Sequence, residues 1–99
     1  MSAQRHETKT YRAARGVGWV ARGNGILIID EVARRSEMLV YPDAAVWDMA
    51  CRGHGRASIR TGLRWIMGDD RMPDDDVALE NLDRWVRDGL LEATAEKVI

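Results

Sequence analysis

Residues Gly25–Trp47 read GILIIDEVARRSEMLVYPDAAVW, and this stretch decides the fold. The run Ile26–Asp30 is short and rich in β-branched side chains, which is typical of a strand. After a polar connector, Glu37–Tyr41 predicts a second strand. Pro42 ends it, because proline cannot donate to a ladder and restricts the residue before it. Asp43 then caps or charges the first turn of a helix.

On the N-terminal side, Val17–Arg22 predicts a further strand that contains Trp19. Gly23-Asn24-Gly25 separates it from Ile26–Asp30, and we expect the Asn-Gly pair to supply the positive φ values of a tight hairpin. The economical arrangement is an antiparallel meander of three strands, with Ile26–Asp30 in the middle.

On the C-terminal side, the helix that begins near Asp43 carries an apolar stripe around Trp47 and ends at a Gly-rich break. Apolar periodicity predicts a second helix over Ala57–Met67. The third opens with Pro73 and acidic residues and is capped near Gly89. The sequence therefore predicts an α+β fold, a three-stranded antiparallel sheet followed by three helices, winged-helix-like.

Ninety-nine residues are enough for one domain. We expect residues 1–15 to be a flexible basic tail and residues 16–95 to form the single domain. The net charge is −1, and the one cysteine, Cys51, excludes an internal disulfide. No secretory signal is visible, and the longest apolar run, Ile26–Ile29, is far too short to span a bilayer. A cytoplasmic location without membrane contact follows as an expectation.

The sequence patterns that could indicate a metal site or a catalytic site are incomplete. Cys51 and His54 form a C-x-x-H pair, but a metal site needs three or four ligands and His6 is distant in sequence. The same pair is separated by a Gly-flanked break, which cannot hold a base against a nucleophile. Asp74–Asp76 lacks the calcium-loop pattern and suits a helix start. We therefore expect no catalytic residues, no metal and no cofactor, and a protein that is not an enzyme.

Nucleic-acid binding is disfavoured by charge. A recognition helix needs Lys and Arg for phosphates, but the third predicted helix is mainly acidic. The second helix carries an arginine stripe, Arg56, Arg60 and Arg64, which indicates a solvated face, an acidic protein partner or DNA. A winged-helix DNA-binding or regulatory module that uses this stripe is the alternative function. A bare interaction module is a third candidate.

The strand Glu37–Tyr41 is the last of the predicted meander and must lie at an edge. An edge presents unpaired N–H and C=O groups, which a protein either protects or uses. Adding a peptide strand there gives affinity through main-chain bonds and specificity through side-chain pockets. Protection by Arg34, Arg35 and Glu37 is the other interpretation, and the sequence leaves both open.

Several short motifs follow one another along this chain. They comprise Gly25, Leu27, Ile28 and Asp30; Leu39; Ala44 and Trp47; and Gly89, Leu90 and Leu91. Together they resemble the PqqD-like family of small peptide chaperones, which tends to show G-x-L-L-x-D, a turn, a strand ending near Leu, A-x-x-W on the first helix and G-L-L at the last helix. The resemblance spans about Val17 to Ala93.

The resemblance implies binding rather than catalysis. A precursor (leader) peptide would add as a strand beside the third strand, lie against the third helix and be presented to a modifying enzyme such as a radical SAM enzyme or a peptidase/cyclase. Arg34, Arg35 and Arg84 would steer an acidic leader, and pockets near Leu39 and Trp85 would fix its register. The expected peptide-binding residues are Arg34, Arg35, Glu37, Met38, Leu39, Val40, Tyr41, Ala78, Asn81, Leu82, Arg84 and Trp85.

Overall fold

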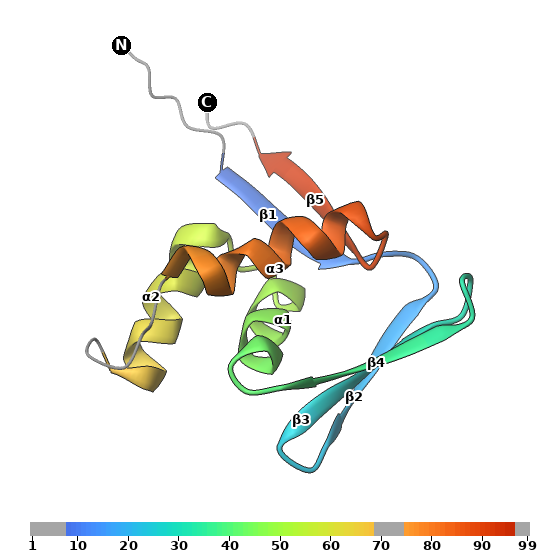
Figure 1. The fold of residues 1–99 in the computed structure, drawn as a ribbon. Helices are drawn as coiled ribbons and strands as arrows, with labels where there is room; N and C mark the ends of the chain where they lie inside the picture. Colours follow the sequence, from blue (N-terminus) through green and yellow to red (C-terminus); the bar gives the residue numbers. More distant parts are fainter. Residues whose placement is uncertain (1–7, 69–74, 97–99) are drawn as a thin grey trace.

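The computed structural model describes residues 8–68 and 75–96, which form two small sheets and a group of helices (Figure 1). In chain order the elements are β1 (Thr8–Ala13), β2 (Val17–Arg22), β3 (Gly25–Asp30), β4 (Arg35–Val40), α1 (Asp43–Cys51), α2 (Arg56–Met67), α3 (Asp75–Arg87) and β5 (Leu91–Glu96). The fold is α+β, and the predicted three-stranded antiparallel sheet followed by three helices is confirmed. A second sheet, made of β1 and β5, was not predicted.

The three-stranded sheet has the order β2-β3-β4, with β3 in the centre as predicted. The turn between β2 and β3 differs from the expectation. Gly23 has φ +61°, whereas Asn24 has no positive φ and Gly25 already belongs to β3. Glycine with positive φ at the first of two turn residues marks a type II′ turn, so the Gly-Asn pair, not the Asn-Gly pair, makes this hairpin.

Asp30 organises the turn between β3 and β4. Its buried carboxylate accepts hydrogen bonds from the backbone N–H groups of Val32 and Ala33, both at 3.1 Å. Arg35 donates from Nε at 3.2 Å to the other carboxylate oxygen. The turn also holds Arg34 at φ +57°. The N–H of Ala33 is the main reason, with Arg35 contributing, that the pKa of Asp30 lies below its ordinary value of 3.8.

Replacing Asp30 by asparagine should lower the unfolding midpoint at pH 7, because a neutral amide does not carry the charge that these donors stabilise. The folded-state pKa of Asp30 is lowered, so the folded protein binds fewer protons than the unfolded chain near that pKa. The stabilisation is therefore present above pH 3.8 and is lost as the pH falls through the folded-state pKa. The difference in urea midpoint between Asp30→Asn and the parent should shrink below that pH. Glu31→Gln, in the same turn, is the control, and an equal effect of both changes would contradict the prediction.

The helices lie close to their predicted ranges. α2 begins one residue before the predicted Ala57. α3 begins at Asp75, and Pro73 lies outside the described residues. Its end is a Schellman motif, in which Gly89 N–H donates to the Val86 carbonyl and Leu90 N–H donates to the Trp85 carbonyl. With φ +82° at Gly89, the predicted glycine cap is confirmed. None of the described helices is long and apolar enough to cross a membrane.

The expectation of a loose tail over residues 1–15 is wrong for Thr8–Ala13. This segment forms β1, which pairs antiparallel with β5 in a register that places Tyr11 opposite Ala93. Tyr11 is only 4% exposed and belongs to the core. The β1 backbone also approaches the loop between α1 and α2 closely, because a Cβ on Gly55 would lie 2.9 Å from the Lys9 carbonyl oxygen. Residues 1–7 lie outside the described part.

The core joins both sheets through the helices. Its centre is a row of tryptophans: Trp47 packs edge-to-face on Trp85, with ring centroids 5.3 Å apart, and Trp19 packs edge-to-face on Trp47 at 6.0 Å. The indole Nε1 atoms of Trp47 and Trp85 have no hydrogen-bond acceptor among the described residues. Edge-to-face packing sets the positive edge of one ring on the negative face of the next, which partly offsets that loss. The other buried apolar residues are Tyr11, Ile26, Ile28, Leu39, Ala44, Val46, Ala50, Ile59, Leu63, Leu79, Leu82, Leu90 and Leu91.

Candidate functional site

Within the described residues, β4 has a strand neighbour on one side only. The hairpin register shows towards which neighbouring strand the N–H and C=O groups of each residue point. Gly25 pairs with Arg22 across a two-residue turn, and Glu31 N–H donates to the Gly16 carbonyl. The odd-numbered residues of β3 therefore bond to β2 and the even-numbered ones bond to β4. Because Ile28 lies opposite Glu37, the odd-numbered residues of β4 face β3, and its even-numbered residues turn their N–H and C=O groups towards the open edge.

Those even-numbered residues are Ser36, Met38 and Val40. Their side chains lie on the sheet face opposite to that of Leu39, because neighbouring residues of a strand point to opposite faces. Leu39 is 3% exposed and packs in the core, whereas Met38 and Val40 are 48% and 57% exposed. We call the Leu39 side the inner face and the Met38 side the outer face.

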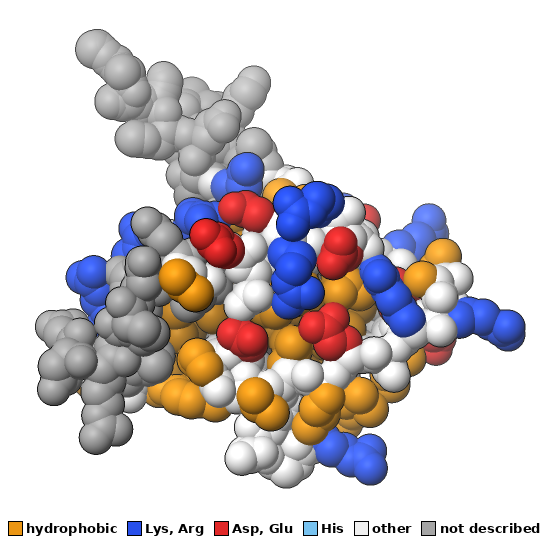
Figure 2. Space-filling model, in the orientation of Figure 1, with side chains coloured by type: hydrophobic (Ala, Val, Ile, Leu, Met, Phe, Trp, Pro, Cys, Tyr) orange, Lys and Arg blue, Asp and Glu red, His pale blue; other side chains and the backbone are white. Residues whose placement is uncertain are grey.

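The inner face of β4 meets the C-terminal half of α3 through polar contacts. Arg84 lies 3.7 Å from Glu37, and both side chains are 39% exposed. Arg35, at the start of β4, donates from a terminal guanidinium nitrogen to the carbonyl oxygen of Asp88, just after the helix. Figure 2 shows side chains of both charges over α3, with apolar side chains gathered below them towards the sheet. The space beside β4 on this face is therefore bordered by charge pairs.

A hydrogen-bond chain fixes the orientation of α3 over α1. Asn81 donates from Nδ2 to Asp43 at 2.9 Å, and Arg84 donates to the Asn81 side-chain oxygen at 3.2 Å. The Arg84 guanidinium also lies over the Trp85 ring, 5.8 Å from its centroid. Asn81 and Arg84 therefore act as one unit that links the start of α1 to the edge strand.

The expected peptide-binding residues divide into three groups. Arg34, Arg35, Glu37, Met38, Val40, Tyr41, Asn81 and Arg84 are exposed or half-buried around β4 and α3. Leu39, Leu82 and Trp85 are at most 3% exposed, so the expectation that they line open pockets is wrong. Their apolar side chains face the core because the helix stripe and the inner sheet face must bury one another. The side chain of Ala78 lies outside the described part of the structure.

Because Leu39 is buried, a substitution there cannot test the edge. Leu39→Arg would place a charge in the apolar core and unfold the domain, whatever the edge binds. Loss of binding in such a variant would therefore carry no information about β4.

A hollow of about 490 Å³ lies at the turn between β3 and β4, lined by Ile29, Asp30, Glu31, Arg34, Arg35 and Ser36. Its lining contains two arginines and two acidic residues, so its formal charge is balanced. Arg35 is bound to Asp30, whereas Arg34 forms no ion pair with any described residue. Of the three arginines expected to steer an acidic leader, Arg34 and Arg35 are both exposed, but Arg35 is paired with Asp30 and Arg84 with Glu37.

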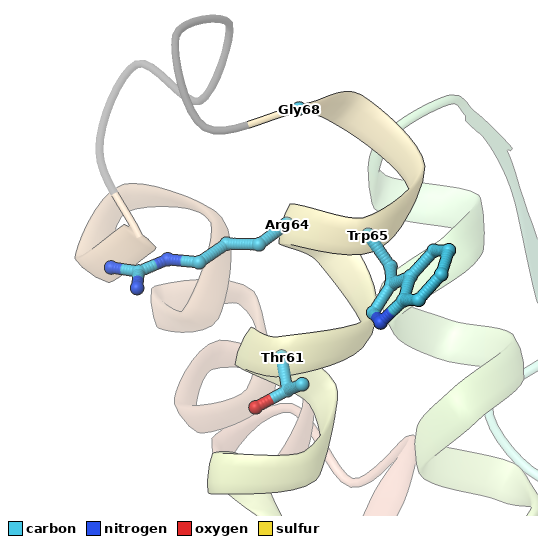
Figure 3. A pocket seen from close by; sticks show the side chains of 4 residues that line it. All are labelled: Thr61, Arg64, Trp65 and Gly68. Carbon is cyan, nitrogen blue, oxygen red and sulfur yellow. The ribbon is translucent and has the colours of Figure 1, made fainter.

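A second hollow, of about 470 Å³, lies on α2 and is lined by Thr61, Arg64, Trp65 and Gly68 (Figure 3). Trp65 is 84% exposed, and its ring and the Arg64 side chain point to opposite sides of the helix. A ligand site needs polar groups that converge, which these side chains do not. The arginine stripe is also partly engaged, since Arg56 forms an ion pair with Asp83 at 3.4 Å.

The Cys51 thiol is half-buried at the end of α1. Burial, with a smaller contribution from Asp48, raises its pKa to about 12. A thiol of that pKa is protonated at neutral pH and is a poor nucleophile. In the described residues, no group of three or more His, Cys, Asp or Glu side chains is placed to hold a metal ion.

Comparisons with protein-family models, with curated proteins and with solved structures find no match. The likeness to the PqqD-like family and to winged helices accordingly stays a prediction from the sequence between Val17 and Ala93.

Sequence reasoning missed the outer face of the sheet. Val20, Leu27 and Met38 form a cross-strand row, because the register places Leu27 opposite both of the others. The signal was present in the uninterrupted run Ile26–Ile29: a strand with one buried face alternates, whereas this one is apolar on both faces.

Proposed function

We propose that this protein binds a peptide strand along the open edge of β4 and presents it to a modifying enzyme. The observation that carries the proposal is the combination of an open main-chain edge at Ser36, Met38 and Val40 with α3 fixed beside it by Arg84 and Glu37. A peptide at that edge would lie between main-chain partners on one side and a charged helix flank on the other.

The energetics favour a sequence-tolerant ligand. Each main-chain hydrogen bond contributes about 0.5–1.5 kcal/mol net, and three edge residues offer both donors and acceptors. The polar border, Glu37 and Arg84, sits at the surface, where ion pairs are worth about 0–1 kcal/mol and can reorganise around a ligand. Affinity would come from the ladder and discrimination from the side chains on either face.

The motifs that resemble the PqqD-like family suggest which peptide this would be. The ligand would be the leader of a ribosomal precursor, and the partner a radical SAM enzyme or a peptidase/cyclase. A binding domain of this kind needs no catalytic residues, because the partner supplies the chemistry. Arg34, exposed in the turn, would meet an acidic leader residue at the end of the ladder.

The proposal is tested by blocking one edge at a time. The probe is the tightest binder selected from a displayed library of random peptides of about 12 residues, synthesised with a fluorophore and titrated by anisotropy. Met38→Pro removes an N–H that faces the open edge and leaves the ladder to β3 intact, so it should weaken binding more than about tenfold. Ser36→Pro does the same with little loss of side chain.

The matched control is Ala21→Pro, which places the same residue at the edge of β2. Because Arg22 bonds to β3, the N–H of Ala21 faces away from β3. This variant should bind like the parent. Equal weakening by both changes, a library without binders, or salt-sensitive binding to duplex DNA that Arg60→Ala and Arg64→Ala abolish would overturn the proposal.

A further inference from the structure

The outer face of the three-stranded sheet carries an apolar patch that no described element covers. The row Val20, Leu27 and Met38 runs across all three strands, and Ile29 and Val40 flank it on either side. Four of these side chains are 41–57% exposed, and Leu27 is partly buried. The helices pack on the other face, through Ile26, Ile28 and Leu39.

The size of the patch limits what can cover it. At these exposures the five side chains present roughly 300–400 Å² of apolar surface, within the range of the largest patches on monomers. A standard interface buries about 800 Å² on each partner, so the patch alone is too small for a stable dimer. A strand added beside β4 would extend this row rather than cover it, because Met38 is the last member of the row and no described strand lies on that side of β4.

We infer that the peptide bound at β4 is an amphipathic strand whose alternate apolar residues continue the outer-face row beyond Met38 and Val40. The inference rests on the proposed function and specifies its ligand class. Peptide residues opposite Met38 and Val40 lie on the outer face, where cross-strand aliphatic pairs stabilise a sheet. Residues opposite Glu37 lie on the inner face, where Arg84 and Asn81 favour polar side chains.

This ligand class differs from the one that the sequence suggested. The resemblance implied an acidic leader whose register is fixed by pockets near Leu39 and Trp85, but both side chains are closed within the core. The side-chain contacts that select the peptide lie instead on the opposite face of the same strand.

Disulfide trapping can show which residues of the bound peptide lie on the outer face of the sheet and which lie on the inner face. Met38→Cys and Glu37→Cys are each made in the full chain with Cys51→Ala, which removes the native thiol. The library-selected peptide is synthesised with one cysteine at each position in turn. Directly opposed residues of paired strands meet the Cα separation that a disulfide requires. Met38→Cys should trap cysteines at the apolar peptide positions, and Glu37→Cys should trap those at the polar positions.

The trapping results separate failure of this inference from failure of the proposed function. Apolar positions trapped by Glu37→Cys, or selected peptides without a period of two, overturn the inference while leaving strand addition in place. A peptide that binds but is trapped by neither variant overturns docking at β4, and with it the proposed function.

A surface substitution gives a second readout. Met38→Asp should weaken the selected peptide on the order of tenfold, because it breaks an aliphatic pair and sets a carboxylate against an apolar side chain. Val32→Asp is the matched control, since Val32 is 79% exposed in the turn and outside the row. Equal affinities of the two variants would contradict the amphipathic ligand.

Discussion

Trp47→Ala is expected to lower the free energy of unfolding by roughly 3–5 kcal/mol, the range for removing a buried aromatic side chain. Trp47 is fully buried and packs edge-to-face on both Trp19 and Trp85. Its loss leaves a cavity where α1, α3 and the sheet meet. A domain of this size has about 5–15 kcal/mol in total, so much of its stability would be gone. Urea unfolding followed by circular dichroism measures the change.

The matched control is Trp65→Ala, the same substitution at a side chain that is 84% exposed. Exposed positions without special contacts change stability by about 0.5 kcal/mol or less. The two variants together separate burial from residue type. Similar midpoints for both would mean that the tryptophan row does not hold the core together.

Tyr11→Ala is expected to have the second-largest effect, a loss of about 3 kcal/mol, comparable with other buried aromatic truncations. Tyr11 is 4% exposed in β1 and belongs to the same core as α1 and α3. For a domain of this length each kcal/mol corresponds to roughly 4–8 °C in Tm. The melting temperature should therefore fall by roughly 12–24 °C, measured by thermal unfolding at pH 7.

Arg12→Ala is the control in the same strand. Arg12 forms an ion pair with Glu92 across the β1–β5 ladder at 2.9 Å, and its side chain is 72% exposed. Surface pairs of this kind contribute about 0–1 kcal/mol, so the change in Tm should be small. If Tyr11→Ala were as mild as Arg12→Ala, residues 8–13 would behave as the loose tail expected from sequence.

The predictable part of the fold came from strong local signals. The run Ile26–Asp30, the stop at Pro42 and the cap at Gly89 each depend on neighbouring residues, and the elements formed close to where these signals placed them. β1 gave no such signal, because Thr8–Ala13 has one large apolar residue and its partner strand, β5, lies at the far end of the chain. Pairing at that separation is decided by tertiary contacts.

The candidate site shows the same division. The sequence identified the edge strand, since the last strand of a meander has one neighbour, and it identified Glu37 and Arg84 near it. It could not assign faces correctly. Leu39, Leu82 and Trp85 were expected in pockets, but packing α3 on the inner face closed them into the core.

The sequence by itself determined, to within about two residues, where the strands of the three-stranded sheet and the first two helices lie, because hydrophobic period, turn residues and prolines act locally. Only the tertiary structure decided that Tyr11 and Leu91 join the core through a second sheet, and which face of β4 stays open. The physical reason is that an edge strand has two faces. Helices distant in sequence bury one face of β4 and leave the other, with Met38 and Val40, exposed to a ligand.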